Sequence, residues 1–222
     1  MASIRPMTAM DLLHFNPTNL DPLTETYNVG FYLEYFSKWP QLCRVIEGHD
    51  GKIEGYSEHA PRLPICRRAP ASGSTHLLTT QLTPSPTVLA KLESSPYAPP
   101  RAPYDPDTNP NPNYLPWHGH ITALTVAPSA RRLGHATKLT EALEQQCDAH
   151  DAWFVDLFVR AENKVALELY RKMGYSVYRR VVGYYNDDSD AFDMRKPLSR
   201  DVGRKHVREG GEDVRVDPSE VW

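Results

Sequence analysis

The segment WFVDLFVR, residues 153–160, constrains the fold more than any other part of this sequence. Its residues are almost continuously apolar, which is typical of a central strand covered on both faces. Helical patterns lie on either side of it. Apolar residues recur at three- and four-residue spacing over 133–147, and NKVALELYRKMG begins near Asn163 and ends at Gly174. The sequence therefore predicts an α/β (α+β) fold in which helices cover a central sheet.

The rest of the chain supplies more strands and two earlier helices. TAMDLLHFN has Thr8 as its N-cap and Asp11 at the capping-box position, which predicts a helix start. TETYNVGFYLEYFSKW places Tyr27, Phe31 and Tyr35 at spacings of four, which predicts a second helix. The predicted strands are SIRPM, LCRVIEG, KIEGYSE, HGHITALTV, YSVYRRVVGYYN and AFDMRKPL.

Proline divides the chain. Thirteen of the twenty prolines fall between Pro61 and Pro116, in a stretch without periodic apolar residues. Because neither flank looks complete alone, we interpret residues 58–116 as a disordered insertion in one domain of residues 1–198. The insertion is alternatively a gene-model artefact, a regulatory lid or a docking segment with polyproline II character. We expect residues 199–222 to form a charged tail with few side chains that could pack on the domain.

Composition narrows the class of protein. The formal net charge of −3 gives no general attraction to nucleic acid or to an anionic membrane. The three cysteines have no CxxC or Cys/His spacing, so neither a disulfide scaffold nor a metal site is expected. No stretch approaches the roughly 20 apolar residues that span a bilayer, and no secretion signal is visible. We therefore expect a soluble cytoplasmic protein.

The turn RRLGHA, residues 131–136, lies between a predicted strand and a predicted helix. A helix N-terminus attracts phosphate through unpaired N–H groups and a partial positive charge. Gly134 has no Cβ, so a diphosphate can approach the backbone, and Arg131 and Arg132 add positive charge. Taken alone, these features equally describe a capped helix start with two solvated arginines.

The spacing Arg131-x-x-Gly134-x-Ala136 resembles the acetyl-CoA signature of the GCN5-related N-acetyltransferases (GNAT), in the same place between strand and helix. The resemblance implies a mixed, mostly antiparallel sheet of about seven strands and about four helices. It also implies that acetyl-CoA is the donor. The residues that it places against the cofactor are Leu124, Thr125, Val126, Arg131, Arg132, Leu133, Gly134, His135, Ala136 and Asn163.

Longer strings narrow the resemblance. FNPTNLDPLTETY, WHGHITALTVAPSARRLG, FVDLFVR, YRKMGYSVYR and FDMRKPLSRD resemble the catalytic subunits of the NatB N-terminal acetyltransferases, in a fungal-like form. This implies acetylation of proteins that begin Met-Asp, Met-Glu, Met-Asn or Met-Gln. It also implies a large helical-repeat (TPR-like) auxiliary subunit and contact with the ribosome through that subunit.

Candidate catalytic residues follow from spacing and resemblance together. Direct transfer to an amine needs a proton donor for the departing thiolate but no nucleophilic residue. Tyr170 lies two helical turns after Asn163 and matches the tyrosine that serves as this acid, although a tyrosine on such a helix is also ordinary core. By period-two alternation we expect His120 on one strand face with Thr122 and Leu124. His120 is the candidate for binding the second side chain or for deprotonating the amine through water.

Several candidates keep an open alternative. His118 points the same way as His120, and the resemblance favours His120. Asp156 is a buried carboxylate to which we assign no role. The resemblance assigns four residues to the peptide site, where the alternatives are a helix start or ordinary strand aromatics: Glu25, Tyr27, Tyr184 and Tyr185.

Two rival functions remain. One is a GNAT that acetylates a lysine side chain or a small polyamine, which would fit an acidic open cleft better than paired tyrosines. The other is a catalytically silent GNAT-like subunit that only binds partners. Loss of the glycine turn or of the helical tyrosine would favour the silent subunit, and the sequence retains both Gly134 and Tyr170.

Overall fold

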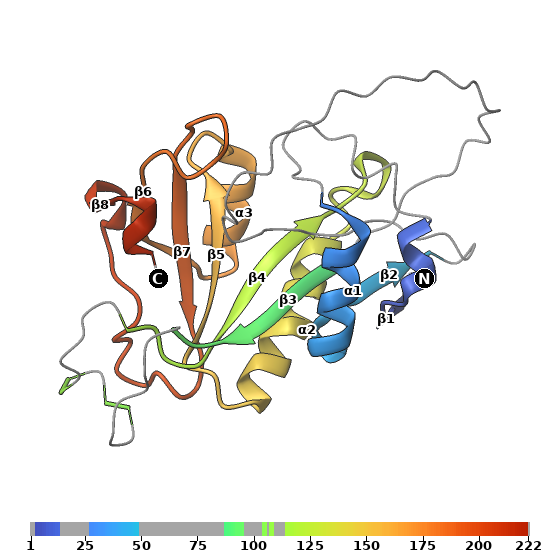
Figure 1. Cartoon of the computed structure of the whole chain (residues 1–222), viewed down its shortest axis with the longest axis horizontal. Coiled ribbons are helices and arrows are strands. Elements are labelled where there is room, and N and C mark those ends of the chain that lie inside the picture. The colour runs from blue at the N-terminus through green and yellow to red at the C-terminus, as the bar shows by residue number, and fades with distance from the viewer. Residues whose placement is uncertain are drawn as a thin grey trace.

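One mixed sheet forms the centre of the molecule. The computed structural model describes residues 3–13, 27–48, 87–95, 104–105, 107–108 and 114–221. Within these ranges eight strands form one sheet in the order β1-β2-β3-β4-β5-β7-β6-β8 (Figure 1). The strands are β1 Ser3–Pro6, β2 Arg44–Glu47, β3 Thr87–Glu93, β4 His118–Thr125, β5 Phe154–Arg160, β6 Ser176–Val181, β7 Ala191–Pro197 and β8 Arg215–Val216.

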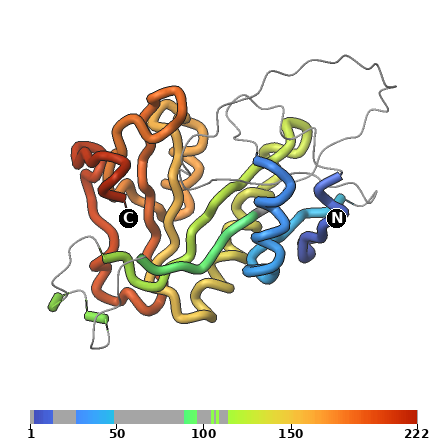
Figure 2. The backbone as a smooth tube through the Cα atoms, viewed as in Figure 1, coloured from blue at the N-terminus to red at the C-terminus, as the bar shows by residue number. Residues whose placement is uncertain are grey.

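The pairing confirms the expected fold class. The β4–β5 and β6–β8 pairs are parallel and the other five pairs are antiparallel. The order β3-β4-β5 requires a crossover between parallel neighbours, and the helix after β4 supplies it. Figure 2 shows the N-terminal and C-terminal segments at opposite edges of the sheet.

The described ranges contain three α-helices, whereas the resemblance implies about four. They are α1 Val29–Lys38, α2 His135–Ala149 and α3 Lys164–Lys172. Asparagines start two of them, because Asn28 Oδ1 accepts from the Phe31 N–H at 3.0 Å and Asn163 Oδ1 from the Ala166 N–H at 3.1 Å. The first predicted helix is a short 3₁₀ turn, η1 Ala9–Leu13, within the described residues.

The helices cover the two faces of the sheet. On one face α1 packs through Tyr32 and Tyr35 on Val45 and Leu89. On the other face α2 and α3 cover the larger core, which includes the odd-numbered residues of β5. At Gly119 in β4 an added Cβ would lie 2.3 Å from Cys147 Sγ of α2, so only glycine permits this close packing. Figure 1 shows α1 and α2 on opposite sides of β3 and β4.

The prediction that residues 58–116 form a disordered insertion is wrong in one part. Strand β3, Thr87–Glu93, lies inside that range and pairs with β4 along its whole length. Leu89 and Ala90 are fully buried. The surrounding prolines hid this strand, although VLAKLE itself contains none. The predicted strand KIEGYSE lies outside the described residues.

The expectation that residues 199–222 pack little is also wrong. Strand β8 extends the sheet beside β6, and Val221 is buried. The Arg179 guanidinium donates to the carbonyl oxygens of Glu220 and Val221 at 3.4 and 3.3 Å. The buried His206 ring stacks on Phe154 with centroids 5.3 Å apart. The buried side chains are spaced singly among charged ones, so composition alone conceals them.

Candidate active site

The turn between β4 and α2 has the geometry of an anion site. A short 3₁₀ turn, η4 Pro128–Ala130, ends β4, and Arg132 and Gly134 then take left-handed backbone angles with φ of 64° and 77°. Gly134 is the N-cap of α2, and a Cβ added there would meet nothing within 4 Å. Space therefore remains directly beside a helix N-terminus, which suits a diphosphate.

Basic and small residues complete this turn. The Arg131 Nε donates to the Val126 carbonyl at 3.1 Å, which ties the turn to the end of the strand. Arg132 and Leu133 are exposed, whereas His135 is buried in the first turn of α2. The residues predicted from the signature thus form one continuous surface of backbone, with Ala136 in the same first turn.

Strands β4 and β5 leave backbone available between them. They pair only over Gly119–Ile121 and Val155–Leu157. On its other side β4 continues to pair with β3 as far as Thr125. In the described structure, the β5-facing backbone edge around Leu124 and Thr125 is therefore not part of the ladder. A pantetheine arm carries amides that suit such an edge.

Helix α3 supplies the candidate acid. Asn163 caps the helix, and Tyr170 follows on the same side two turns later. Tyr170 is buried, and burial raises the pKa of its phenol above the usual value, so the hydroxyl keeps its proton near neutral pH. Its ring meets the Tyr175 ring edge to face, with centroids 5.7 Å apart. The turn, the strand edge and Tyr170 each offer the chemistry that one part of a thioester bearing a diphosphate requires.

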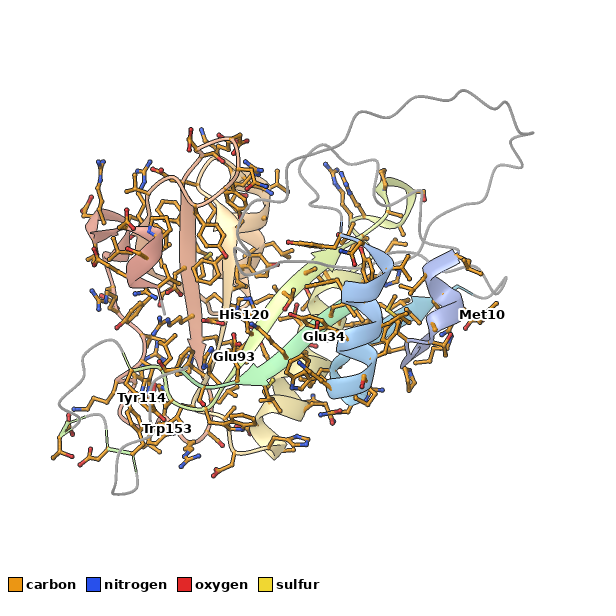
Figure 3. All side chains as sticks on the ribbon, in the orientation of Figure 1. Met10, Glu34, Glu93, Tyr114, His120 and Trp153 are labelled. Atoms are coloured by element: carbon orange, nitrogen blue, oxygen red, sulfur yellow. The ribbon has the colours of Figure 1, made fainter. Side chains whose placement is uncertain are left out.

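The candidate acceptor site starts at His120 in the middle of the sheet (Figure 3). Its Nδ1 lies 2.7 Å from Asp156 Oδ1 on β5, and both side chains are buried. The ring also packs on Phe158 with centroids 5.8 Å apart, and Phe158 stacks on Tyr184 at 4.8 Å. A line of side chains therefore runs from β4 through β5 to the loop between β6 and β7.

The β6–β7 loop places the two predicted tyrosines together. The rings of Tyr184 and Tyr185 meet edge to face with centroids 5.2 Å apart. The Arg160 guanidinium lies 4.0 Å from the Tyr185 ring centroid and bonds Asp187 of the same loop. The geometry thus brings His120 and this pair of tyrosines into one aromatic cluster. Glu25 lies outside the described residues.

An aromatic row on α1 borders the same face of β4. Tyr27 stacks on Phe31 at 4.5 Å, and Phe31 packs on Tyr35 at 4.7 Å. The Tyr35 hydroxyl lies 2.9 Å from Thr122 Oγ1, a hydrogen bond within a buried environment. Tyr27 is therefore joined to β4 through this row of aromatic side chains.

The expectation that Leu124 shares a face with His120 is wrong. The β3–β4 register shifts between Leu89 and Ala90, so that Leu89 pairs with Ala123 but Ala90 pairs with Ile121. Beyond this bulge Leu124 packs on the core under α2. A bulge inserts one residue and reverses the alternation, and bulges often lie beside active sites. Period-two counting along β4 does not reveal it.

Comparison with known proteins agrees with this geometry. Residues 104–175 match the Acetyltransferase (GNAT) family. Over its full length the chain is 40% identical to the N-terminal acetyltransferase B complex catalytic subunit naa20 of Schizosaccharomyces pombe, of which it covers 99%. It is 38% identical to the corresponding subunit of Arabidopsis thaliana, over 93% of this chain and 91% of that protein.

The chain belongs to the family of N-terminal acetyltransferase B catalytic subunits. It has the GNAT fold and is an acetyltransferase. Among solved structures, Chaetomium thermophilum Naa20 in complex with a bisubstrate analogue matches with a TM-score of 0.78 and 44% identity, over 99% of each chain.

Sequence reasoning about this acetyltransferase missed two parts of the site. Phe158, which joins His120 to Tyr184, reads as one more apolar residue of a buried strand. Asp156 was visible as the one carboxylate in that strand, and its place opposite His120 follows from the parallel β4–β5 register. The signal was a charged residue in an otherwise apolar strand, since such groups are rarely buried without a partner.

The described residues of this acetyltransferase form neither a metal-binding cluster nor a helix that could span a membrane. Within the described ranges, no group of three or more His, Cys, Asp and Glu side chains is placed to hold a metal ion. None of the described helices is long and apolar enough to cross a membrane.

Proposed function

We propose that this chain transfers the acetyl group of acetyl-CoA to the α-amine of an N-terminal methionine followed by Asp, Glu, Asn or Gln. One observation carries the proposal. The Gly134 turn lies just beyond the C-terminal end of β4, and His120 lies within the same strand. A donor site and an acceptor site on one strand suit direct transfer between two bound substrates.

Bound acetyl-CoA supplies an acetyl thioester, whose carbonyl carbon forms a C–N bond with the neutral α-amine as the C–S bond breaks. The chain's residues hold the partners and move protons. Backbone N–H groups of residues 131–136 hold the diphosphate, and the edge of β4 around Leu124–Val126 orients the pantetheine arm. Asn163 lies at the start of α3 beside this path, with its side chain used in the cap.

Tyr170 donates the proton that the departing thiolate needs. Its raised pKa keeps the hydroxyl protonated at neutral pH, which is the state that a general acid requires. The amine must lose a proton to a base, and Glu25 is the candidate while His120 is occupied by the second side chain.

The acceptor site recognises the first two residues of the peptide. Tyr27, Tyr184 and Tyr185 offer apolar walls and hydroxyl groups that suit a methionine side chain and the peptide backbone. His120 binds the second side chain, and Glu25 meets the α-amine. In this assignment each wall comes from a different element, so selectivity depends on how α1, β4 and the β6–β7 loop are held together.

A large helical-repeat auxiliary subunit completes the enzyme and brings it to the ribosome in the cytoplasm. Solved relatives include a NatB acetyltransferase complex bound to a bisubstrate inhibitor. Among the described residues, half of the ten large exposed apolar side chains lie in β1, η1 and α1, which supports a partner surface there. They are Ile4, Met10, Leu13, Val29 and Leu33.

The test is acetyl transfer from acetyl-CoA to a peptide panel, by the chain with its auxiliary subunit and by the chain alone. We expect Met-Asp to exceed Met-Leu and Ser-Glu by at least about tenfold in kcat/KM. Equal rates on all three would contradict the proposed selectivity. Transfer only to an internal lysine, in a peptide with a blocked N-terminus, would support the rival lysine acetyltransferase, and no transfer at all the silent subunit.

A further inference from the structure

Asp156 lies in the centre of the sheet between two histidines. Its Oδ1 is 2.7 Å from His120 Nδ1, and its Oδ2 is 3.7 Å from His118 Nε2. The carboxylate is 2% exposed, and β4 and β5 hold it opposite His120 by backbone register. A buried carboxylate at this position needs partners that compensate its charge, because desolvation strongly disfavours an isolated charge.

The other charges around Asp156 are already paired. On β3, Lys91 Nζ lies 2.6 Å from Glu93 Oε2. On β7, the Arg195 guanidinium lies 2.9 Å from Asp193. Glu93 Oε1 is 3.9 Å from His118 Nε2, so His118 has acidic neighbours on both β3 and β5. The two histidines of β4 are therefore the groups that compensate the negative charge of Asp156.

Asp156 stays ionised in this setting. Burial works against its charged form, yet the positive charge of His118 and His120, the hydrogen bond from His120 and the more distant Arg195 hold its pKa below the usual value. An ionised carboxylate only accepts hydrogen bonds. The bond to His120 therefore requires hydrogen on Nδ1 in both protonation states of the ring.

His118 is held by one ring nitrogen and is closed to solvent at the other. Its Nδ1 lies 2.7 Å from the Pro116 carbonyl, and its Nε2 is buried without a hydrogen-bond partner among the described residues, 3.7 Å from Asp156 and 3.9 Å from Glu93. The ring is 1% exposed and stacks on Phe154 with an interplanar angle of 7°. His120 differs, because Asp156 engages Nδ1 and leaves Nε2 for a substrate. This difference favours His120 as the substrate-binding member of the pair.

We propose that Asp156 is a positioning residue, which fixes the His120 ring with Nδ1–H toward itself and holds Nε2 as a protonated donor toward the substrate's second side chain. This inference rests on the proposed function. It explains why one site accepts four residue types, since Asp, Glu, Asn and Gln all end in an sp² oxygen that accepts such a bond. A charged donor also favours the carboxylates over the amides.

The most direct test is ¹⁵N NMR of the full-length protein labelled at histidine, with the His120 signals assigned from a His120→Gln variant. We expect the neutral ring at high pH to carry its hydrogen on Nδ1, the tautomer that Asp156 selects. A neutral ring with hydrogen on Nε2 would overturn the proposal. The measurement needs neither substrate nor turnover, so it decides the role of Asp156 even if the proposed function fails.

The kinetic test is Asp156→Asn, with kcat/KM for Met-Asp and Met-Asn peptides measured from about pH 6 to about pH 9. The neutral amide at position 156 accepts the Nδ1–H bond more weakly than the carboxylate does. The preference for Met-Asp over Met-Asn should therefore fall by about tenfold. The KM for acetyl-CoA should not change, because the Gly134 turn is untouched.

Glu144→Gln is the matched control. Glu144 is also a buried carboxylate, but it bonds Tyr175 and Lys196 on the opposite face of the sheet. We expect this variant to lose stability and to keep the wild-type pH profile. If Asp156→Asn lowers only the melting temperature and leaves the Met-Asp preference and its pH profile unchanged, Asp156 is structural and the proposal fails. A wild type without any preference for Met-Asp over Met-Leu would instead refute the proposed function.

Discussion

The proposed donor site and the proposed acceptor site of this acetyltransferase are built in different ways. The donor site is one continuous run of backbone, from the end of β4 through the left-handed Gly134 to the start of α2. The acceptor site is assembled from side chains on α1, β4, β5 and the β6–β7 loop, joined through Phe158 and Asp156. The donor site therefore depends on local conformation, and the acceptor site depends on tertiary packing.

The largest expected effect breaks the donor site alone. In Gly134→Asp a carboxylate stands beside the bound diphosphate, and like charges about 4 Å apart repel by about 4 kcal/mol near a protein surface. Affinity for acetyl-CoA, measured by calorimetry, should fall by about 100-fold or more. The control Gly134→Ala meets no steric clash but strains a left-handed residue by about 1 kcal/mol. Equal affinities of Gly134→Asp and the wild type for acetyl-CoA would show that the diphosphate does not bind at this turn.

The next effect concerns the candidate acid on α3. Tyr170→Phe removes the proposed acid while keeping the buried ring, so kcat should fall by about 100-fold with little change in either KM. Tyr175→Phe is the matched control, since that ring contacts Tyr170 and its hydroxyl bonds Glu144 at 2.9 Å. It should lower the melting temperature and leave kcat within a few-fold of wild type. An unchanged kcat in Tyr170→Phe would exclude it as the acid.

A smaller change separates the acceptor site from the donor site. Phe158→Leu keeps a buried apolar side chain but removes the stack between His120 and Tyr184, and such aromatic pairs contribute about 1 kcal/mol. The KM for a Met-Asp peptide should rise by about fivefold, and the KM for acetyl-CoA should stay constant. Phe192→Leu, in the core under α2 and α3, is the control and should change neither constant. A rise in both constants for Phe158→Leu would show that the two sites are not independent.

The smallest effect concerns the C-terminal segment, which supports the acceptor side of the sheet. Its His206 stacks on Phe154, the same ring on which His118 stacks. Burial holds the pKa of His206 below its usual value despite Asp201 nearby. The unfolded chain thus binds this proton more readily than the folded chain. The contribution of His206 to the free energy of unfolding should therefore be complete above about pH 6.5 and should decrease as the pH drops below that value.

Denaturant titrations at several pH values check this. His206→Phe should reduce the loss of stability between about pH 6.5 and about pH 5, because the ring no longer takes up a proton. His150→Phe, at the exposed C-terminal end of α2, serves as the control. If the two variants show the same pH dependence as the wild type, His206 does not contribute to it.

The sequence predicted the backbone turn of the proposed donor site but only part of the packing around the proposed acceptor site, because the first is local and the second is not. A signature such as Arg131-x-x-Gly134-x-Ala136 encodes backbone geometry within six residues, and the structure has the left-handed glycine that it requires. The bulge in β4 and the stack on Phe158 depend on neighbouring strands, which no local pattern contains. Strand β3 was missed because prolines surround it, and Asp156 lacked a role until register placed it opposite His120.

We predict that this protein holds acetyl-CoA at the Gly134 turn and a Met-Asp terminus at the His120 cluster at the same time. The direct measurement is the dissociation constant of conjugates in which CoA is joined through an acetyl linker to Met-Asp or Met-Leu peptides. We predict that the Met-Asp conjugate binds at least about tenfold more tightly than the Met-Leu conjugate. Gly134→Asp should weaken both, and His120→Gln should remove the difference. Equal binding of the two conjugates to the wild type would contradict the account.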